Sequence, residues 1–116
     1  MRERAVTFTR EQIAAYAEAS GDRNPIHLDD GVATAAGLPG IIAHGMLQMS
    51  ILGCVAAEAA GGGAHLRKLY CRFSGMVEPG DTVTFSAEDA GPGTLALSAV
   101  NQRGEPVLTK AAAEYL

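Results

Sequence analysis

The chain divides into a first half patterned for helices and a second half patterned for strands. Ile13, Tyr16 and Ala17 recur at helical spacing, and Thr9 stands where a helix N-cap is expected. The pattern therefore predicts a helix that begins after Thr9 and ends near Ser20-Gly21.

Short segments lie on either side of this helix. Residues 5–8 are typical of a short strand. Residues 21–30 are rich in Asp, Asn, Pro and Gly, which predicts a loop with defined turns. We expect a short helical turn over 30–36, and a second loop over 37–40 that contains Pro39.

The strongest element is residues 45–60, which carry almost no charged or strongly polar side chain before Glu58. A helix that is apolar on every side is predicted to be buried. Its length falls short of the roughly 20 residues that span a bilayer, and it contains Gln48 and Ser50. Gly61–Gly63 is expected to end it.

Turn residues divide the rest of the chain into four predicted strands: 66–77, 82–88, 94–100 and 106–116. One apolar helix followed by an antiparallel meander with one apolar face predicts an α+β fold, in which the helix lies across that face. A sheet wrapped around one central helix is the hot-dog fold, here a single domain over 1–116. A lone copy would leave exposed sheet edges and a thin core, so we expect a dimer.

Charge and composition remove several classes of function. The net charge is −4, and the basic residues form no block longer than Arg67-Lys68, so nothing predicts a nucleic-acid partner. No signal region or long apolar run is present, which predicts a cytoplasmic protein that does not bind a membrane. Cys54 and Cys71 lie in apolar stretches, and we expect both to be buried free thiols.

The loop after the first helix holds the best candidates for chemistry. Asp22 and His27 stand five residues apart, and Pro25 stiffens the chain between them. A carboxylate beside an imidazole can act as an acid/base pair near neutral pH. From spacing alone a second interpretation stays open, in which Asp22 and Asn24 cap backbone N–H groups and His27 packs at the rim.

The start of the long helix offers a second candidate. Its first N–H groups lack partners, and Gly45 would let a substrate oxygen approach closely, as in an oxyanion hole for a thioester enolate. A tight entry turn is the alternative. For His44 we expect a structural hydrogen bond to the neighbouring loop, and Ser50 could line a pocket or bond to its own helix. The histidines form no metal-ligand spacing, so no metal is predicted.

Two segments together carry a family resemblance: Tyr16…Ser20-Gly21-Asp22-Arg23-Asn24-Pro25-Ile26-His27, and Ala43-His44-Gly45-Met46-Leu47 downstream. They resemble the R-specific enoyl-CoA hydratases and MaoC-like dehydratases, and the likeness extends over essentially the whole chain. It implies that Asp22 and His27 hold and activate one water, that Asn24 orients them, and that Gly45 donates to the oxyanion.

The resemblance also implies a reaction without a cofactor, the interconversion of trans-2-enoyl and (R)-3-hydroxyacyl thioesters of coenzyme A or an acyl carrier protein. The protein would be a homodimer or one subunit of a heterodimer. Ser50 would partly replace a Ser that relatives carry where this chain has Gly53. The acyl chain would lie beside Met46, Met49, Leu52 and Phe73. A hot-dog acyl thioesterase and a subunit that only completes a heterodimeric dehydratase are the alternatives.

Overall fold

The structure, a computed structural model, describes residues 2–116, so Met1 of the predicted domain lies outside the described residues. Its helices are α1 (Arg10–Ser20), α2 (Asp30–Ala35) and α3 (Gly45–Ala59), with two short 3-10 turns, η1 (Pro25–His27) and η2 (Gly63–His65). The helix pattern of the sequence is thereby confirmed. Thr9 caps α1 as predicted, since its side chain accepts a hydrogen bond from the Gln12 N–H at 3.1 Å.

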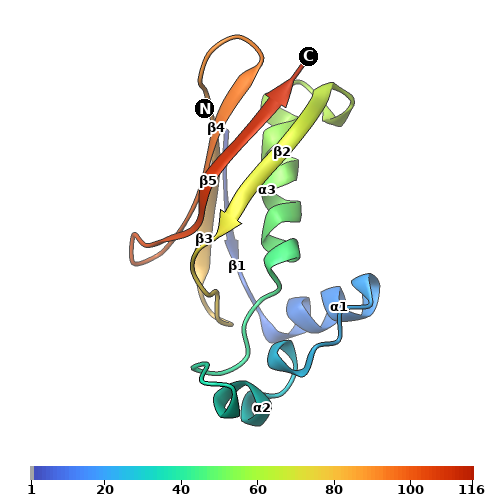
Figure 1. Cartoon of the computed structure of the whole chain (residues 1–116), viewed down its shortest axis with the longest axis vertical. Coiled ribbons are helices and arrows are strands. Elements are labelled where there is room, and N and C mark those ends of the chain that lie inside the picture. Colours follow the sequence, from blue (N-terminus) through green and yellow to red (C-terminus); the bar gives the residue numbers. More distant parts are fainter. Residues whose placement is uncertain (1) are drawn as a thin grey trace.

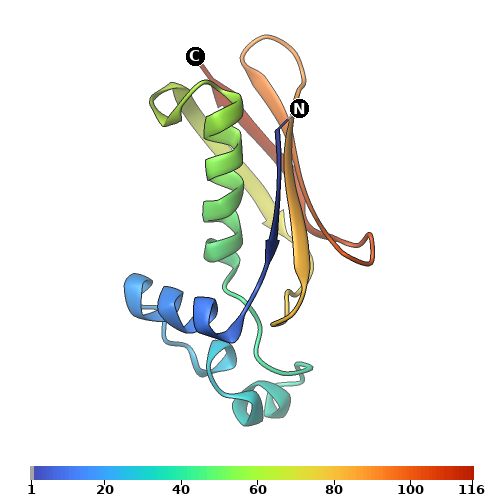
Figure 2. The ribbon, with the colours of Figure 1, turned by 180° about the vertical axis from the view of Figure 1, so that it is seen from behind.

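Five strands form one antiparallel sheet: β1 (Arg2–Thr7), β2 (Leu66–Phe73), β3 (Thr82–Asp89), β4 (Thr94–Asn101) and β5 (Pro106–Tyr115). Their order across the sheet is β1-β3-β4-β5-β2. α3 lies along one face of this sheet (Figures 1 and 2). α1 and α2 lie together beyond the N-terminal end of α3. The predicted α+β arrangement of a sheet around one helix is confirmed.

The predicted simple meander is wrong for β2. Only β3, β4 and β5 follow one another across the sheet, while β2 lies at the far edge and pairs with β5. β1 takes the place beside β3 that a meander would give to β2, with Val6 opposite Val83. A strand has only two hydrogen-bonding edges, and those of β3 are taken by β1 and β4. β2 therefore cannot pair with β3 and pairs with β5 instead.

One side of α3 is buried against the sheet, and the other is open in the single chain. Leu52 and Val55 are fully buried, whereas Met46, Ser50 and Cys54 on the other side are exposed. The prediction of a helix buried all round is therefore wrong for this chain alone. The prediction of buried thiols fails for the same reason at Cys54, and Cys71 is partly exposed.

Two glycines let β2 approach α3 closely. A Cβ atom added to Gly45 would lie 3.1 Å from ring carbons of Phe73, and one added to Gly53 would lie 3.2 Å from Leu69. Both distances are tighter than ordinary contacts, so a side chain at either position would require Phe73 or Leu69 to move by a few tenths of an ångström. The glycines thus let these two side chains of β2 lie directly on α3.

The carboxylate of Asp30 links α1, α2 and the segment before α3. Asp30 accepts a hydrogen bond from the Ile41 N–H at 3.0 Å and forms an ion pair with Arg10 of α1 at 2.9 Å. Its contact with the Ile41 N–H, followed by that with Arg10, lowers the pKa of Asp30. The chain before α3 is therefore held against both smaller helices.

Within residues 2–116, no helix has the length and hydropathy needed to cross a bilayer.

Lys110 has a backbone φ of +47° in β5, where the pairing of β5 with both β2 and β4 shifts register. A left-handed conformation costs an L-residue about 1–2 kcal/mol, and glycine avoids that cost. We expect Lys110→Gly to be more stable than Lys110→Ala by about 1 kcal/mol in urea unfolding. Equal stabilities of these two variants would show that the position is not strained.

Asp81 is 6% exposed and accepts hydrogen bonds from the Glu78 N–H at 2.9 Å and the Gln102 amide at 2.8 Å. Burial by itself raises the pKa of Asp81, but these two donors and the charge of Arg103 outweigh it and lower the pKa below 3.8. The charged form is therefore favoured by folding, and its stabilisation is lost as the pH falls through that lowered pKa.

We accordingly expect Asp81→Asn to lose about 1–2 kcal/mol of unfolding free energy at pH 7. The difference from the wild type should shrink below pH 4 because the wild-type carboxyl then becomes neutral as well. Urea unfolding at pH 7 and at lower pH measures this. The matched control is Asp89→Asn, at the exposed end of β3, the strand that begins directly after Asp81. A pH-independent loss at Asp81 would contradict the argument.

Candidate functional site

Local capping bonds shape the loop that follows α1. Gly21, with φ +81°, ends the helix. One carboxylate oxygen of Asp22 accepts from the Asn24 N–H at 3.2 Å, and the side-chain oxygen of Asn24 accepts from the Ile26 N–H at 3.2 Å. Asn24 thereby caps η1, the turn that carries His27. The capping interpretation from sequence is correct for Asp22 and Asn24, and it leaves the second Asp22 oxygen for another partner.

His27 lies inside the fold rather than at its rim. It is 8% exposed, and its Nδ1 lies 2.7 Å from the carbonyl oxygen of Ile42. A carbonyl oxygen can only accept, so Nδ1 carries the hydrogen. The neutral ring then has its lone pair on Nε2. His27 is thus prepared to accept a proton at Nε2.

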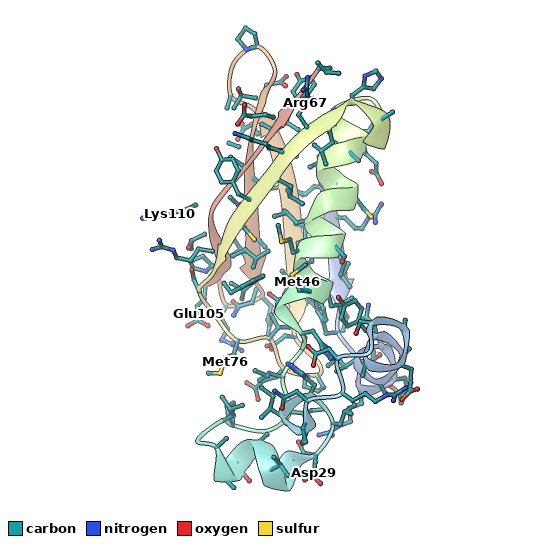
Figure 3. The ribbon with its side chains drawn as sticks, turned by 45° about the vertical axis from the view of Figure 1, so that its right-hand side comes forward. Asp29, Met46, Arg67, Met76, Glu105 and Lys110 are labelled. Carbon is teal, nitrogen blue, oxygen red and sulfur yellow. The ribbon has the colours of Figure 1, made fainter. Side chains whose placement is uncertain are left out.

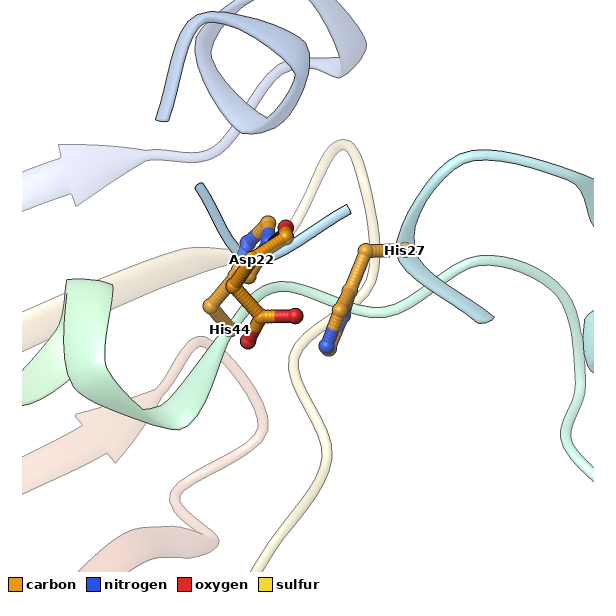
Figure 4. A group of neighbouring side chains, drawn as sticks. All are labelled: Asp22, His27 and His44. Carbon is orange, nitrogen blue, oxygen red and sulfur yellow. Dashed lines mark hydrogen bonds between the residues drawn. The ribbon is translucent and has the colours of Figure 1, made fainter. Parts of the chain in front are cut away.

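Asp22 and His27 come together with His44. One side-chain atom from each of the three lies within 4.8 Å of the others, and Figure 4 shows the Asp22 carboxylate on the side of the His27 ring nitrogens. Two hydrogen bonds of about 2.8 Å from one water, at a roughly tetrahedral angle, end on atoms about 4.6 Å apart. The 4.8 Å limit admits such a water, and because Asp22 is exposed, water can reach the pair.

His44 makes the hydrogen bond to the neighbouring loop that the sequence predicted. Its Nε2 lies 2.9 Å from the backbone oxygen of Asp22. Its ring also stacks on His27, with centroids 3.9 Å apart and planes 22° apart, and Tyr16 meets it edge-on at 4.8 Å. Sequence spacing gave no sign of this stack, because 17 positions separate the two histidines.

The same three side chains could suggest a metal site, and their geometry does not fit one. The two rings stack face to face, with planes 22° apart and 3.9 Å between centroids. An ion in the plane of one ring therefore lies outside the plane of the other, whereas imidazole nitrogens bind a metal in the ring plane at roughly 2.0–2.1 Å.

Gly45 is the first residue of α3 and follows His44 directly, so the N-terminus of the helix opens beside this cluster. No backbone or side-chain acceptor within residues 2–116 takes its N–H. The space of its missing side chain is filled by Phe73. A side chain here would require the Phe73 ring to move slightly, so packing favours a glycine at this position. The oxyanion role of Gly45 stays a prediction.

The side chains expected along the substrate fall into two groups. Met46 is 55% exposed, Met49 is partly buried, and Ser50 is exposed and donates to the Met46 carbonyl oxygen at 2.7 Å (Figure 3). These three line the open side of α3. Leu52 is fully buried in the core of the single chain, and its expected place beside the acyl chain stays a prediction.

The cluster is not enclosed by the single chain. Clefts of about 360, 430 and 290 Å³ lie on the molecule, and each is lined by residues other than Asp22, His27 and Gly45. The first lies between Arg2 and Glu58 and the second beside Arg67, both away from α1 and η1. An acyl chain at the cluster would therefore lie against surfaces that this chain leaves open.

Known proteins share both the sequence and the fold. The chain is 33% identical over 109 residues to a peroxisomal hydratase-dehydrogenase-epimerase of Neurospora crassa, covering 94% of this chain and 12% of that protein. It is 39% identical over 79 residues to the 3-hydroxyacyl-thioester dehydratase Y of Mycobacterium tuberculosis, covering 66% of this chain and 27% of that protein. The chain thus spans only a small part of these relatives.

A solved structure, an (R)-hydratase from A. caviae involved in PHA biosynthesis, superposes with a TM-score of 0.81 at 26% identity and covers 96% of this chain and 89% of its own. A family model described as "MaoC like domain" matches residues 1–110. The resemblance carried by the two motifs is confirmed. The chain belongs to the MaoC-like dehydratase family and has its hot-dog fold.

Proposed function

We propose that this protein adds water to trans-2-enoyl thioesters and removes it from (R)-3-hydroxyacyl thioesters, carried on coenzyme A or an acyl carrier protein. One observation carries the proposal: a carboxylate and an imidazole meet beside the start of α3, with a side-chain atom of each within 4.8 Å of the other, so that one water can reach both. Relatives named as hydratases and thioester dehydratases support it.

In the hydration direction, the water between Asp22 and His27 attacks Cβ of the enoyl group. A C–O bond forms while the water gives one proton to the pair, with Nε2 of His27 as the acceptor. The electrons of the C=C bond move onto the thioester as an enolate. One member of the pair then returns a proton to Cα, and the product is a 3-hydroxyacyl thioester.

The enolate oxygen needs a donor as it gains charge. In the proposal, this donor is the free N–H of Gly45, which also lies at the positive end of the α3 dipole. Losing one such donor typically costs about 3–4 kcal/mol of barrier. Water and the acyl thioester supply all atoms and electrons of the reaction, so the acid/base pair needs no redox partner.

We expect Asp22→Asn and His27→Ala each to lower kcat for hydration of crotonyl-CoA by at least about 100-fold, because each removes one partner of the water. Loss of enoyl absorbance measures the rate, and circular dichroism measures folding. His65→Ala is the matched control, since His65 is exposed and lies on η2. A folded variant at position 22 or 27 with full activity would contradict the proposal, and thiol release from saturated acyl-CoA would support a thioesterase instead.

We also propose that the working form is a dimer, with a homodimer as the first choice. Both edge strands carry charged residues, Arg2, Glu3 and Arg4 on β1 and Arg67, Lys68 and Arg72 on β2. Of the two, only β2 leaves large rings half-exposed, those of Tyr70 and Phe73. A second copy at β2 would cover these rings and the open side of α3. It would also enclose the acyl chain at the cluster.

This assembly predicts a mass of about twice 12.0 kDa in solution. Tyr70→Asp should shift the protein toward the monomer and lower its activity, because it places a charge on the apolar edge. Ala5→Asp on β1 is the matched control and should leave the mass unchanged. Light scattering after size exclusion measures both. A fully active monomer would contradict the dimer, and a chain active only with a second, different subunit would support the heterodimer.

A further inference from the structure

We infer that His44 is a positioning residue for the proposed reaction: its ring holds the Asp22 loop by one hydrogen bond and holds His27 by stacking. The inference rests on the proposed function. It concerns a buried ring that takes no part in the proton transfers described above. His44 touches Asp22 and His27, and it would act on substrate only through them.

The first contact fixes the carboxylate. Nε2 of His44 donates to the backbone oxygen of Asp22 at 2.9 Å, since a carbonyl oxygen can only accept. His44 is 2% exposed, so water does not compete for this bond. Asp22 itself is exposed, on a loop between α1 and η1. The bond therefore ties an open loop to the rigid start of α3, which also carries Gly45.

The second contact fixes the imidazole. The hydrogen bond from Nδ1 of His27 to the Ile42 oxygen sets the direction of the ring within its plane. The stack with His44, at 3.9 Å and 22°, restricts rotation out of that plane. Tyr16 packs edge-on against His44 and supports it. With both constraints, Nε2 of His27 keeps one direction, on the side of the Asp22 carboxylate.

The unused nitrogen of His44 indicates that its ring is neutral. Nδ1 is buried and has no hydrogen-bond partner in residues 2–116. A proton there would be a buried donor without an acceptor, next to the ring that must accept a proton during the reaction. A neutral ring stacked on His27 instead presents its π face to the imidazolium that forms.

The side chain of His44 does not cap α3, so capping does not explain why a histidine stands at this position. His44 occupies the N-cap position, yet its side chain makes no hydrogen bond to the first turn. Residues usually preferred at that position, such as Ser or Asp, would make one. The polar atoms of His44 are therefore directed at the catalytic loop rather than at its own helix.

Three substitutions separate the two contacts. His44→Gln offers a side-chain N–H for the Asp22 oxygen without a ring, His44→Phe keeps a ring for the stack without a donor, and His44→Ala removes both. We expect kcat for crotonyl-CoA hydration to fall by about 100-fold in His44→Ala, and by less in the other two, because misplacing catalytic groups by about 1 Å has this effect. KM should change by less than about two-fold.

A double variant tests whether His44 acts through Asp22. In an Asp22→Asn background, His44→Ala should lower the residual kcat by less than it lowers that of the wild type, because the part of its effect that acts through the carboxylate is already lost while the part that acts through His27 remains. Additive losses would overturn the inference. So would an unchanged kcat in folded His44→Ala, or a raised KM with unchanged kcat, which would instead indicate substrate binding.

A second measurement does not depend on activity. Nitrogen-15 NMR of the ring nitrogens should show His27 with its hydrogen on Nδ1 in both proteins, because the Ile42 oxygen sets that tautomer. The His27 resonances should broaden by exchange only in His44→Ala, where the stack no longer holds the ring. Unbroadened His27 resonances in that variant would overturn the inference. If all His44 variants behave as the wild type while Asp22→Asn and His27→Ala are inactive, only this inference fails. If the wild type does not hydrate enoyl thioesters, the proposed function fails, and the NMR result decides the role of His44 separately.

Discussion

The site depends on how the four residues before α3 are held. Each of them bonds a different part of the chain: Ile41 N–H to Asp30, Ile42 N–H to the Ile26 oxygen, Ile42 oxygen to His27, Ala43 N–H to the Val77 oxygen, and His44 Nε2 to the Asp22 oxygen. This segment belongs to no helix or strand, so its backbone donors and acceptors are available to other parts of the chain. It joins α2, η1, the sheet connection and the loop after α1 at one place. Without it, the acid, the base and the helix terminus would lie on three separate loops.

Packing of α3 explains why a site at its first turn can be both rigid and open. The helix is fixed along one side by the core and at two glycines by Phe73 and Leu69, so its N-terminus cannot shift without loss of these contacts. Its other side carries Met46, Ser50 and Cys54 and contacts nothing in the chain that would cover it. Rigidity and exposure therefore come from opposite faces of one helix. An apolar substrate and a second copy would both find their surfaces on the open face.

Sequence patterns predicted the helices and strands well, because side-chain alternation and capping act between residues that are close in the chain. The alternation of Val83, Phe85 and Ala87 predicted β3, and Thr9 predicted the start of α1. Strand order could not be predicted in this way, since β1 and β2 compete for the same edge of β3 and the outcome depends on pairing across the whole chain. Exposure of Cys54 was missed because an apolar helix in one small chain has only one sheet to cover it. At the site, the two motifs predicted Asp22 and His27, but the stack of His27 on His44 depends on how two loops fold together.

Asp22 and His27, the proposed acid/base pair, differ in how far water can reach their side chains. Asp22 is exposed and keeps one oxygen free of the chain, while His27 is 8% exposed with one nitrogen bonded to a carbonyl. Water can therefore reach the carboxylate first, and it meets the imidazole only at Nε2. The neighbouring His44 is more buried still and has no free donor toward solvent. Burial thus increases from the Asp22 carboxylate through His27 to the His44 ring behind it. In the proposed reaction, a proton taken from water would pass inward to the His27 ring, whose other nitrogen is already hydrogen-bonded.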